Sequence, residues 1–151
     1  MKSDPLITFR RKPGQLDIDS LEDFAEALRL RVLRGREFHC LITGDAELQR
    51  LNSQFRGKDA PTDVLSFPQE DGPSGANKGY AGDLAISLAR TRAQAKQFGH
   101  PVETEIRVLM LHGVLHLKGM DHETDSGEMA KTEKRWRKTL GLPAGLVERT
   151  K

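Results

Sequence analysis

Cysteine, long apolar runs and an excess of one charge are all scarce in this sequence of 151 residues. Its single cysteine, Cys40, cannot form an internal disulfide, which favours a reducing compartment. Cys40 lies in an apolar run and is expected to be a small buried side chain. No apolar stretch has the length of a signal peptide or a membrane span. These absences exclude a disulfide-held scaffold and predict a cytoplasmic protein with no membrane partner.

The charges are nearly balanced: the formal net charge is +2, although 30 % of the residues are charged. Such a balance does not by itself indicate nucleic-acid binding. The basic residues cluster, however, and a cluster can attract phosphates or can simply be a solvated helix face, which is the simpler interpretation of each one alone. The clusters are Arg10, Arg11 and Lys12; Arg29, Arg31, Arg34 and Arg36; and Lys131, Lys134, Arg135, Arg137 and Lys138.

Three of the five histidines stand in the segment HGVLHLKGMDH, at His112, His116 and His122. On a helix, His112 and His116 share one face because they are four residues apart. Gly119 can end that helix in a left-handed conformation and turn His122 toward the same point. Three nitrogen ligands with a fourth position for water are typical of a catalytic zinc site. We therefore predict one Zn²⁺ ion here, although nickel or copper would also suit the ligands.

The second residue of this segment excludes one familiar reaction. The zinc-protease signature H-E-x-x-H-x-x-G-x-x-H has the same spacing, but Gly113 stands where that signature has glutamate. Glycine has no side chain that could accept a proton from water, so a zinc protease is a minor alternative. A metal-bound water could still attack another substrate, because the ion lowers the pKa of the water.

Apolar periodicity and turn residues predict helices and strands within one domain that covers residues 1–151. The expected strands are 6–9, 38–43, 64–67 and 80–86. Helices are expected to start near Asp19 or Ser20, at Gly44 or Asp45, at Ser87, near Pro101, and at Asp125 or Ser126. Two successive strands without an intervening helix indicate a hairpin in a mixed sheet.

The helix that carries His112 and His116 is apolar on nearly every side, which is typical of a buried helix. Ligands on a packed helix are held more precisely than ligands on a loop. We therefore expect an α+β fold in which a small mixed four-stranded sheet packs against a buried central metal-binding helix surrounded by other helices.

The segment H-G-x-L-H-L-x-G-x-D-H resembles the YbeY family of bacterial metal-dependent endoribonucleases. Residues 51–68, L-N-x-x-x-R-x-x-x-x-x-T-D-V-L-S-F-P, and residues 82–87, G-D-L-A-I-S, are similar to segments of the same family and extend the resemblance over most of the chain. The resemblance implies the fold given above. It also implies cleavage of single-stranded RNA in the maturation of the 3′ end of small-subunit ribosomal RNA, a role in ribosome quality control, and association with ribosomes or ribosomal proteins.

Two further residues are candidates for catalysis. Arg56 matches an arginine that lies beside the metal cleft in the family, and its guanidinium could hold a scissile phosphate with two parallel hydrogen bonds. Without the resemblance, a surface arginine at a helix C-terminus would be the simpler interpretation. Asp121 could accept a histidine N–H or a proton, or could be an ordinary turn residue. Asp83 could face the site or pair with a neighbour in the sheet.

Two other functions stay open from the sequence. One is a metal-dependent hydrolase of a peptide or small ester, which the glycine at position 113 disfavours for peptides. The other is a non-catalytic ribosome-assembly factor with a structural metal, although a structural zinc normally has four protein ligands. The glycine-rich residues 69–79 read as a loop whose composition does not show whether it borders a site.

Overall fold

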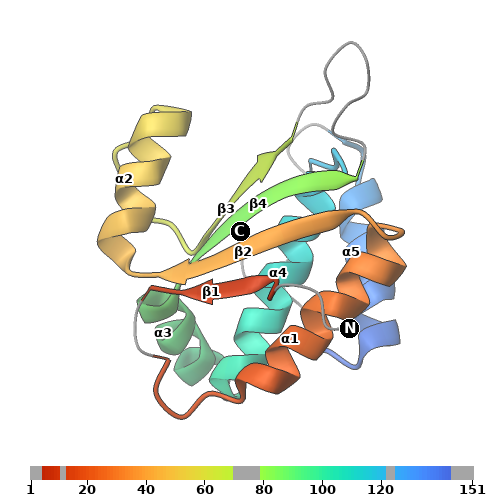
Figure 1. Cartoon of the computed structure of the whole chain (residues 1–151), viewed down its shortest axis with the longest axis horizontal. Helices are drawn as coiled ribbons and strands as arrows, with labels where there is room; N and C mark the ends of the chain where they lie inside the picture. Colours follow the sequence, from red (N-terminus) through yellow and green to blue (C-terminus); the bar gives the residue numbers. More distant parts are fainter. Residues whose placement is uncertain (1–4, 11–12, 70–78, 122–124, 144–151) are drawn as a thin grey trace.

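A computed structural model describes residues 5–10, 13–69, 79–121 and 125–143. The fold is α+β, with a four-stranded mixed sheet and helices gathered mainly on one of its faces (Figure 1). The elements, in chain order, are β1 (Ile7–Phe9), α1 (Ile18–Ala27), the π-helix η1 (Leu28–Val32), β2 (Glu37–Thr43), α2 (Asp45–Arg56), β3 (Val64–Pro68), β4 (Tyr80–Ser87), α3 (Leu88–Phe98), α4 (Val102–Leu117) and α5 (Glu128–Leu140).

The sheet has the strand order β1-β2-β4-β3. Strands β1, β2 and β4 run parallel, whereas β3 pairs antiparallel with β4. The expectation of a mixed sheet with one hairpin is therefore confirmed. The parallel neighbours are joined through helices, as parallel pairing requires, and β3 is left at an edge of the sheet.

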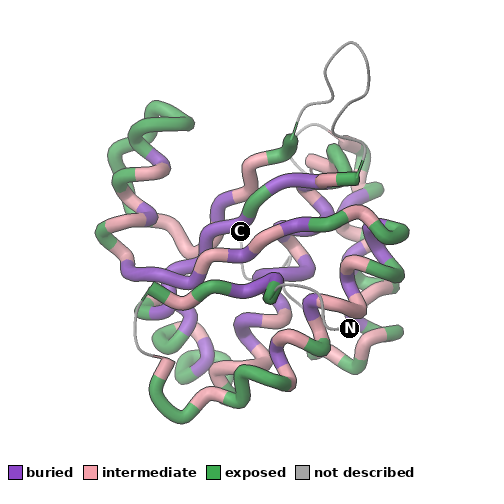
Figure 2. Tube along the Cα trace, viewed as in Figure 1, coloured by how far each residue is buried: buried purple, intermediate pink, exposed green. Residues whose placement is uncertain are grey.

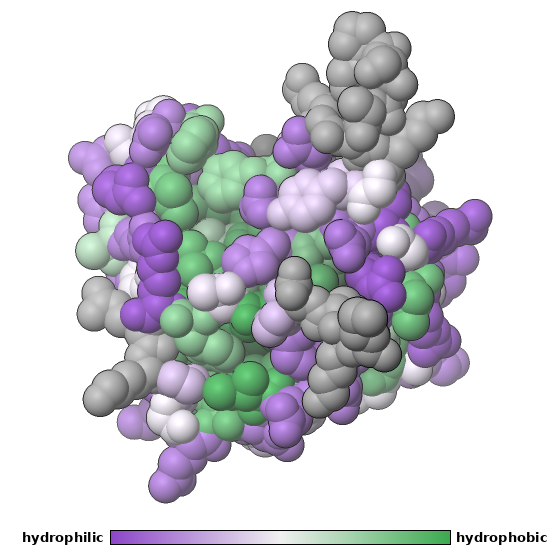
Figure 3. All heavy atoms as spheres, viewed as in Figure 1, coloured by the Kyte–Doolittle hydropathy of each residue, from purple (hydrophilic) through white to green (hydrophobic). Residues whose placement is uncertain are grey.

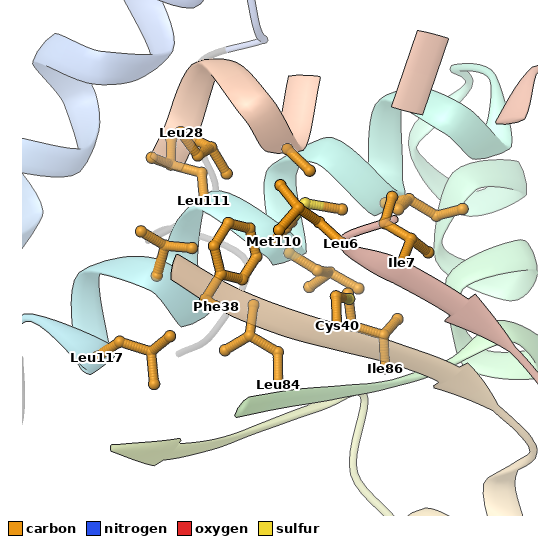
Figure 4. Close-up of a cluster of buried hydrophobic side chains, with 14 of the residues drawn as sticks. Leu6, Ile7, Leu28, Phe38, Cys40, Leu84, Ile86, Met110, Leu111 and Leu117 are labelled. Atoms are coloured by element: carbon orange, nitrogen blue, oxygen red, sulfur yellow. The ribbon is translucent and has the colours of Figure 1, made fainter. Parts of the chain in front are cut away.

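Helix α4 lies at the centre of the fold. It contacts β3 and β4 on one side and α1, α3 and α5 on the others. Ten of its 16 residues are buried, so the prediction of a buried central helix is confirmed. Figure 4 shows Met110 and Leu111 of α4 meeting Phe38 of β2 and Leu84 of β4 in the core. None of the described helices is both long and apolar enough to cross a membrane.

The other face of the sheet carries much less. Ser66 of β3 points at α4, because its Oγ donates a hydrogen bond to the carbonyl of Gly113. Its neighbours along the strand therefore face away from α4, and Leu65 packs there with Leu48 of α2 and Ala85 of β4 in a small separate cluster. The last turn of α2 is exposed (Figure 2). Hydrophobic groups are visible between α2 and the sheet in the space-filling view (Figure 3).

The helix starts differ from the expected ones at two places. The first helix is capped by Asp17, whose carboxylate accepts the backbone N–H of Ser20, and not by Asp19 or Ser20. The last helix begins at Glu128, but Asp125 still caps it, because its two carboxylate oxygens accept the N–H groups of Gly127 and Met129. In both cases a short acidic side chain accepts hydrogen bonds from free N–H groups at the start of the helix. The sequence has more than one residue near each helix start that could do so, and therefore does not identify the cap.

Candidate metal centre

The last two turns of α4 bring His112 and His116 together. Their Nε2 atoms are 3.3 Å apart, and the ring centroids are 4.8 Å apart at an interplanar angle of 75°. Two nitrogens that each lie about 2.0–2.1 Å from a tetrahedral zinc ion would be about 3.3 Å from one another. The spacing of the two rings therefore fits two ligands of one ion. Both rings are half-buried on a packed helix, which restricts their motion.

The helix ends immediately after this pair. The N–H of Gly119 donates to the carbonyl of His116 at 2.9 Å, and the N–H of Met120 donates to the carbonyl of Leu115 at 3.2 Å. These two bonds form a Schellman motif, which needs a left-handed residue at the position of Gly119, and its φ is +92°. The predicted turn is present, but His122, the third predicted ligand, lies outside the described residues. Within the described part of the chain, no three His, Cys, Asp or Glu side chains gather as a metal site.

A carboxylate that the sequence did not reveal holds one of the two histidines. Nδ1 of His112 is 2.6 Å from Oε1 of Glu133 on α5, and the Glu133 side chain is 1 % exposed. A carboxylate that accepts Nδ1–H leaves Nε2 with its lone pair, which is the form of imidazole that binds a metal. Oε2 of the same carboxylate lies 3.8 Å from the buried guanidinium of Arg137. Glu133 thus orients His112 toward His116.

Arg137 itself departs from the sequence interpretation. The sequence pattern groups it with the solvent-facing basic residues of the last helix, but its side chain is 4 % exposed and lies beside Glu133. The group Lys131, Lys134, Arg135 and Lys138 remains exposed. A helix of 3.6 residues per turn places residues 133 and 137 on the face opposite to residues 131, 135 and 138. The basic residues that form one cluster in the sequence are therefore divided between a buried face and an exposed face of α5.

Gly113 lies on the side of α4 that packs against β3 and β4. A Cβ atom at this position would be 2.7 Å from Cδ2 of Leu84 and 3.3 Å from Oγ of Ser66. Such a short carbon–carbon distance requires the neighbouring side chain to move. A glutamate at this position would have to displace the end of the Leu84 side chain, so packing favours glycine in the place of the protease base.

The two candidate catalytic residues lie at the ends of helices. Arg56 is the last residue of α2 and is exposed, and no hydrogen bond or ion pair among the described residues joins it to either histidine of α4. Asp121 is half-buried just beyond the Schellman turn. The acceptor at Nδ1 of His112 is Glu133 and not Asp121.

Asp83 pairs with a neighbour in its own strand. Because Leu84 of β4 faces α4, Asp83 lies on the opposite face of the sheet. Its carboxylate accepts a hydrogen bond of 2.5 Å from the hydroxyl of Tyr80. Partial burial and this carboxylate raise the pKa of the Tyr80 phenol. Of the two roles left open for Asp83, the geometry favours the pairing within the sheet.

Comparisons with known proteins assign a family to the chain. The family model described as Endoribonuclease YbeY matches residues 11–141. The chain is 59 % identical over 143 residues to the Endoribonuclease YbeY of Solibacter usitatus, covering 95 % of this chain and 92 % of that protein. It is 43 % identical over 139 residues to that of Nautilia profundicola, covering 92 % of this chain and 94 % of the relative. The solution structure of TM1509 from Thermotoga maritima matches with a TM-score of 0.59 at 27 % identity, covering 89 % of this chain and 88 % of that one. The chain belongs to the Endoribonuclease YbeY family.

Proposed function

We propose that this chain is a zinc-dependent endoribonuclease that cleaves single-stranded segments of ribosomal RNA. The observation that carries the proposal is the pair of Nε2 atoms 3.3 Å apart, with the Nδ1 atom of His112 held by the buried carboxylate of Glu133. The names of the relatives supply the reaction class, since they are called endoribonucleases. Maturation of the 3′ end of small-subunit ribosomal RNA, ribosome quality control, ribosome association and a cytoplasmic location complete the proposal on the strength of the family resemblance.

In this proposal His112, His116 and His122 hold one ion. A bound zinc ion supplies a water of lowered pKa and polarises a phosphoryl oxygen. Glu133 keeps the proton of His112 on Nδ1 and so keeps Nε2 available as a ligand. Arg56 would hold the scissile phosphate through its guanidinium. Asp121, just beyond the turn, would accept the proton that the attacking water or 2′-hydroxyl releases. Gly113 takes no part in proton transfer, because it has no side chain. The space that a side chain would enter is occupied by Leu84.

The test is cleavage of a ribosomal RNA 3′ fragment by the zinc-loaded protein. His116→Ala is purified in parallel and should not cut, and a chelator should stop the wild type. His100→Ala is the matched control, because His100 also contacts a buried glutamate, at 2.7 Å, but lies before the first turn of α4; it should cut like the wild type. Equal cutting by wild type and His116→Ala would identify a contaminating nuclease. Zinc binding without cleavage by the wild type would favour the non-catalytic assembly factor.

Arg56 is tested separately once cleavage is established. Arg56→Lys keeps the positive charge but removes the two-pronged donor, so a role in holding the phosphate predicts a cleavage rate reduced about tenfold or more in both Arg56→Lys and Arg56→Ala. Zinc affinity should not change in either variant, because the described contacts do not link Arg56 to the histidines. Wild-type rates in both variants would leave Arg56 as a surface residue.

A further inference from the structure

Helix α5 presents two faces of different chemistry. Its inner face carries Glu133 and Arg137, which lie beside the candidate metal centre. Its outer face carries four exposed cations with one exposed acid, Glu128, at its beginning. We call these four residues the α5 cationic face: Lys131, Lys134, Arg135 and Lys138. Lys131 lies three and four residues before Lys134 and Arg135, and Lys138 lies four and three residues after them, so the four form one stripe about 10 Å long at the rise of an α-helix.

Several arginines elsewhere on the surface have an acidic partner, although other exposed cations of the described residues, such as Lys58 and Lys96, are in no salt bridge. Arg10 and Arg50 both pair with Glu47, Arg29 pairs with Glu26, and Arg90 pairs with Asp45. Among the described residues, no salt bridge involves a member of the α5 cationic face. Like charges three or four residues apart destabilise a helix. The helix dipole offsets this for Lys138 in the last turn but not for Lys131 near the start, so helix stability does not account for the stripe.

The stripe also has a shape that can take a ligand. Its side chains, together with Glu128 and Thr132, line an open groove of about 530 Å³. The aliphatic stems of lysine and arginine form apolar walls while their charged ends stay in water. A groove of this kind suits a polymer with regularly spaced negative charges and apolar surfaces between them.

Trp136, the only tryptophan of the chain, does not belong to this stripe. At 3.6 residues per turn it lies on the side of α5 that carries Met129, Glu133 and Leu140, and it packs against the hydrophobic core. The guanidinium of Arg31, from η1, lies over its ring at 5.8 Å from the centroid. The stripe therefore offers cations and aliphatic stems without an aromatic ring, which suits contacts to the phosphates of a nucleic-acid strand and not stacking on its bases.

We propose that the α5 cationic face binds the phosphate backbone of single-stranded RNA outside the metal centre. The inference rests on the proposed function, since it names where the same substrate is held. Helix α5 packs against α4 (Figure 1). Glu133, on the side of α5 opposite to the cationic face, contacts His112. RNA on the outer face would thus lie about one helix diameter, roughly 10–12 Å, from the helix that carries the candidate ligands. The face would hold substrate near the site without contacting the reacting phosphate.

The experiment measures RNA binding in a form of the full chain that cannot cut. In a His116→Ala background, the four cations are changed together by Lys131→Gln, Lys134→Gln, Arg135→Gln and Lys138→Gln. The matched control removes the same charge from exposed positions elsewhere, by Arg34→Gln, Arg50→Gln, Lys58→Gln and Lys96→Gln. The probe is a fluorescent oligouridine of about 20 nucleotides, and its dissociation constant is measured at several salt concentrations.

We expect the α5 variant to bind at least about tenfold more weakly near physiological salt, and its slope of log affinity against log salt to fall by about 3, which is the value for four lost contacts to a single strand. The control should stay within about threefold, as expected for a distributed electrostatic effect.

Three results would overturn the inference. The first is an unchanged dissociation constant and slope in the α5 variant, and the second is an equal loss in the control. The third is displacement of the RNA by polyglutamate of matched charge at equal concentration, which would assign the face to acidic protein segments. The proposed function is read independently from cleavage by the protein with intact histidines. A wild type that binds but does not cut contradicts that function alone, whereas an α5 variant that cuts with unchanged KM contradicts only the α5 assignment.

Discussion

The two ends of α4 carry histidine–glutamate contacts that look alike in isolation. At the N-terminal end, Nε2 of His100 lies 2.7 Å from Oε1 of Glu105, and the side chains are 14 % and 0 % exposed. At the C-terminal end, Nδ1 of His112 lies 2.6 Å from Oε1 of Glu133, and the side chains are 15 % and 1 % exposed. Distance and burial do not separate the two contacts. A buried histidine–carboxylate pair is therefore not by itself evidence for a functional site.

The two contacts differ in which nitrogen of the histidine ring meets the glutamate and in what faces the second ring nitrogen. Nε2 of His100 contacts Glu105, which lies in the first turn of the helix. A carboxylate in that turn also interacts favourably with the helix dipole. The ring of His100 stacks near Phe98, and no contact within the described chain joins it to another histidine. His112 uses Nδ1, and its Nε2 faces the Nε2 of His116. The first contact fastens a helix start, whereas the second leaves two nitrogens converging on one point.

The largest expected difference between the ends is in zinc binding. His116→Ala removes one of the converging nitrogens and should lower zinc affinity and RNA cleavage by on the order of 10³-fold or more. His100→Ala should leave both unchanged and instead cost about 1–3 kcal/mol of unfolding free energy, because the buried Glu105 loses a partner. Zinc titration by calorimetry and urea unfolding of the metal-free protein measure the two quantities. Equal zinc affinity in the two variants would show that the ends of α4 do not differ in the way proposed.

The carboxylates give the next largest contrast. Glu133→Gln keeps the size of the side chain but removes the charge that favours Nδ1–H on His112, so zinc affinity should fall about 10–100-fold. Glu105→Gln makes the same chemical change at the other end and should leave zinc affinity unaltered. Both variants should lose some stability, so a loss of zinc affinity in Glu133→Gln alone cannot be a general effect of unfolding. Wild-type affinity in Glu133→Gln would reduce its contact with His112 to a structural one.

The sequence predicted one half of this contrast and missed the other. A spacing of four residues on a helix fixes the relation of His112 to His116, and a glycine at a helix end fixes the turn at Gly119. The contact of His112 with Glu133 joins residues 21 positions apart on two helices. Its existence depends on how α5 is rotated against α4, which local periodicity does not specify. One signal was present: Glu133 is four residues after the buried Met129 and so lies on the buried face of its helix, where a carboxylate requires a partner.

The same distinction applies to the first helix and the sheet. Alternation and apolar runs predict each strand to within one residue at its ends, because those patterns are local. They did not predict that α1 continues as the π-helix η1, in which the N–H of Leu33 donates to the carbonyl of Leu28 at 3.0 Å. An extra residue in a helical turn leaves Leu28 and Val32 buried as an α-helix would. The pattern of apolar residues therefore does not distinguish the two helix types here.

A third prediction concerns the residue between the two histidine turns. Gly113→Ala adds a methyl group 2.7 Å from Cδ2 of Leu84, so the Leu84 side chain, or α4 beside His112, must shift. Overpacking of this kind costs about 1–3 kcal/mol, less the gain in helix propensity of up to about 1 kcal/mol. Thr104→Ala, near the other end of α4 and half-buried, provides the control and should change stability by less than about 1 kcal/mol. Urea unfolding compares them, and equal stabilities would show that the Gly113 contact relaxes without cost.

The smallest effect on the free energy of unfolding is expected for Tyr80 and Asp83, a polar pair on the face of the sheet that points away from α4. Tyr80→Phe removes the hydrogen bond to the exposed Asp83 and should cost less than about 1 kcal/mol at pH 7, with zinc affinity unchanged. Folding raises the pKa of this phenol, so the unfolded chain loses its proton first as the pH rises. The stabilisation by Tyr80 is therefore complete below the ordinary tyrosine pKa of about 10 and declines above it. The difference in unfolding free energy between wild type and Tyr80→Phe should shrink between about pH 10 and pH 11, and a difference that grew with pH would mean that the phenolate, and not the phenol, is the stabilised form.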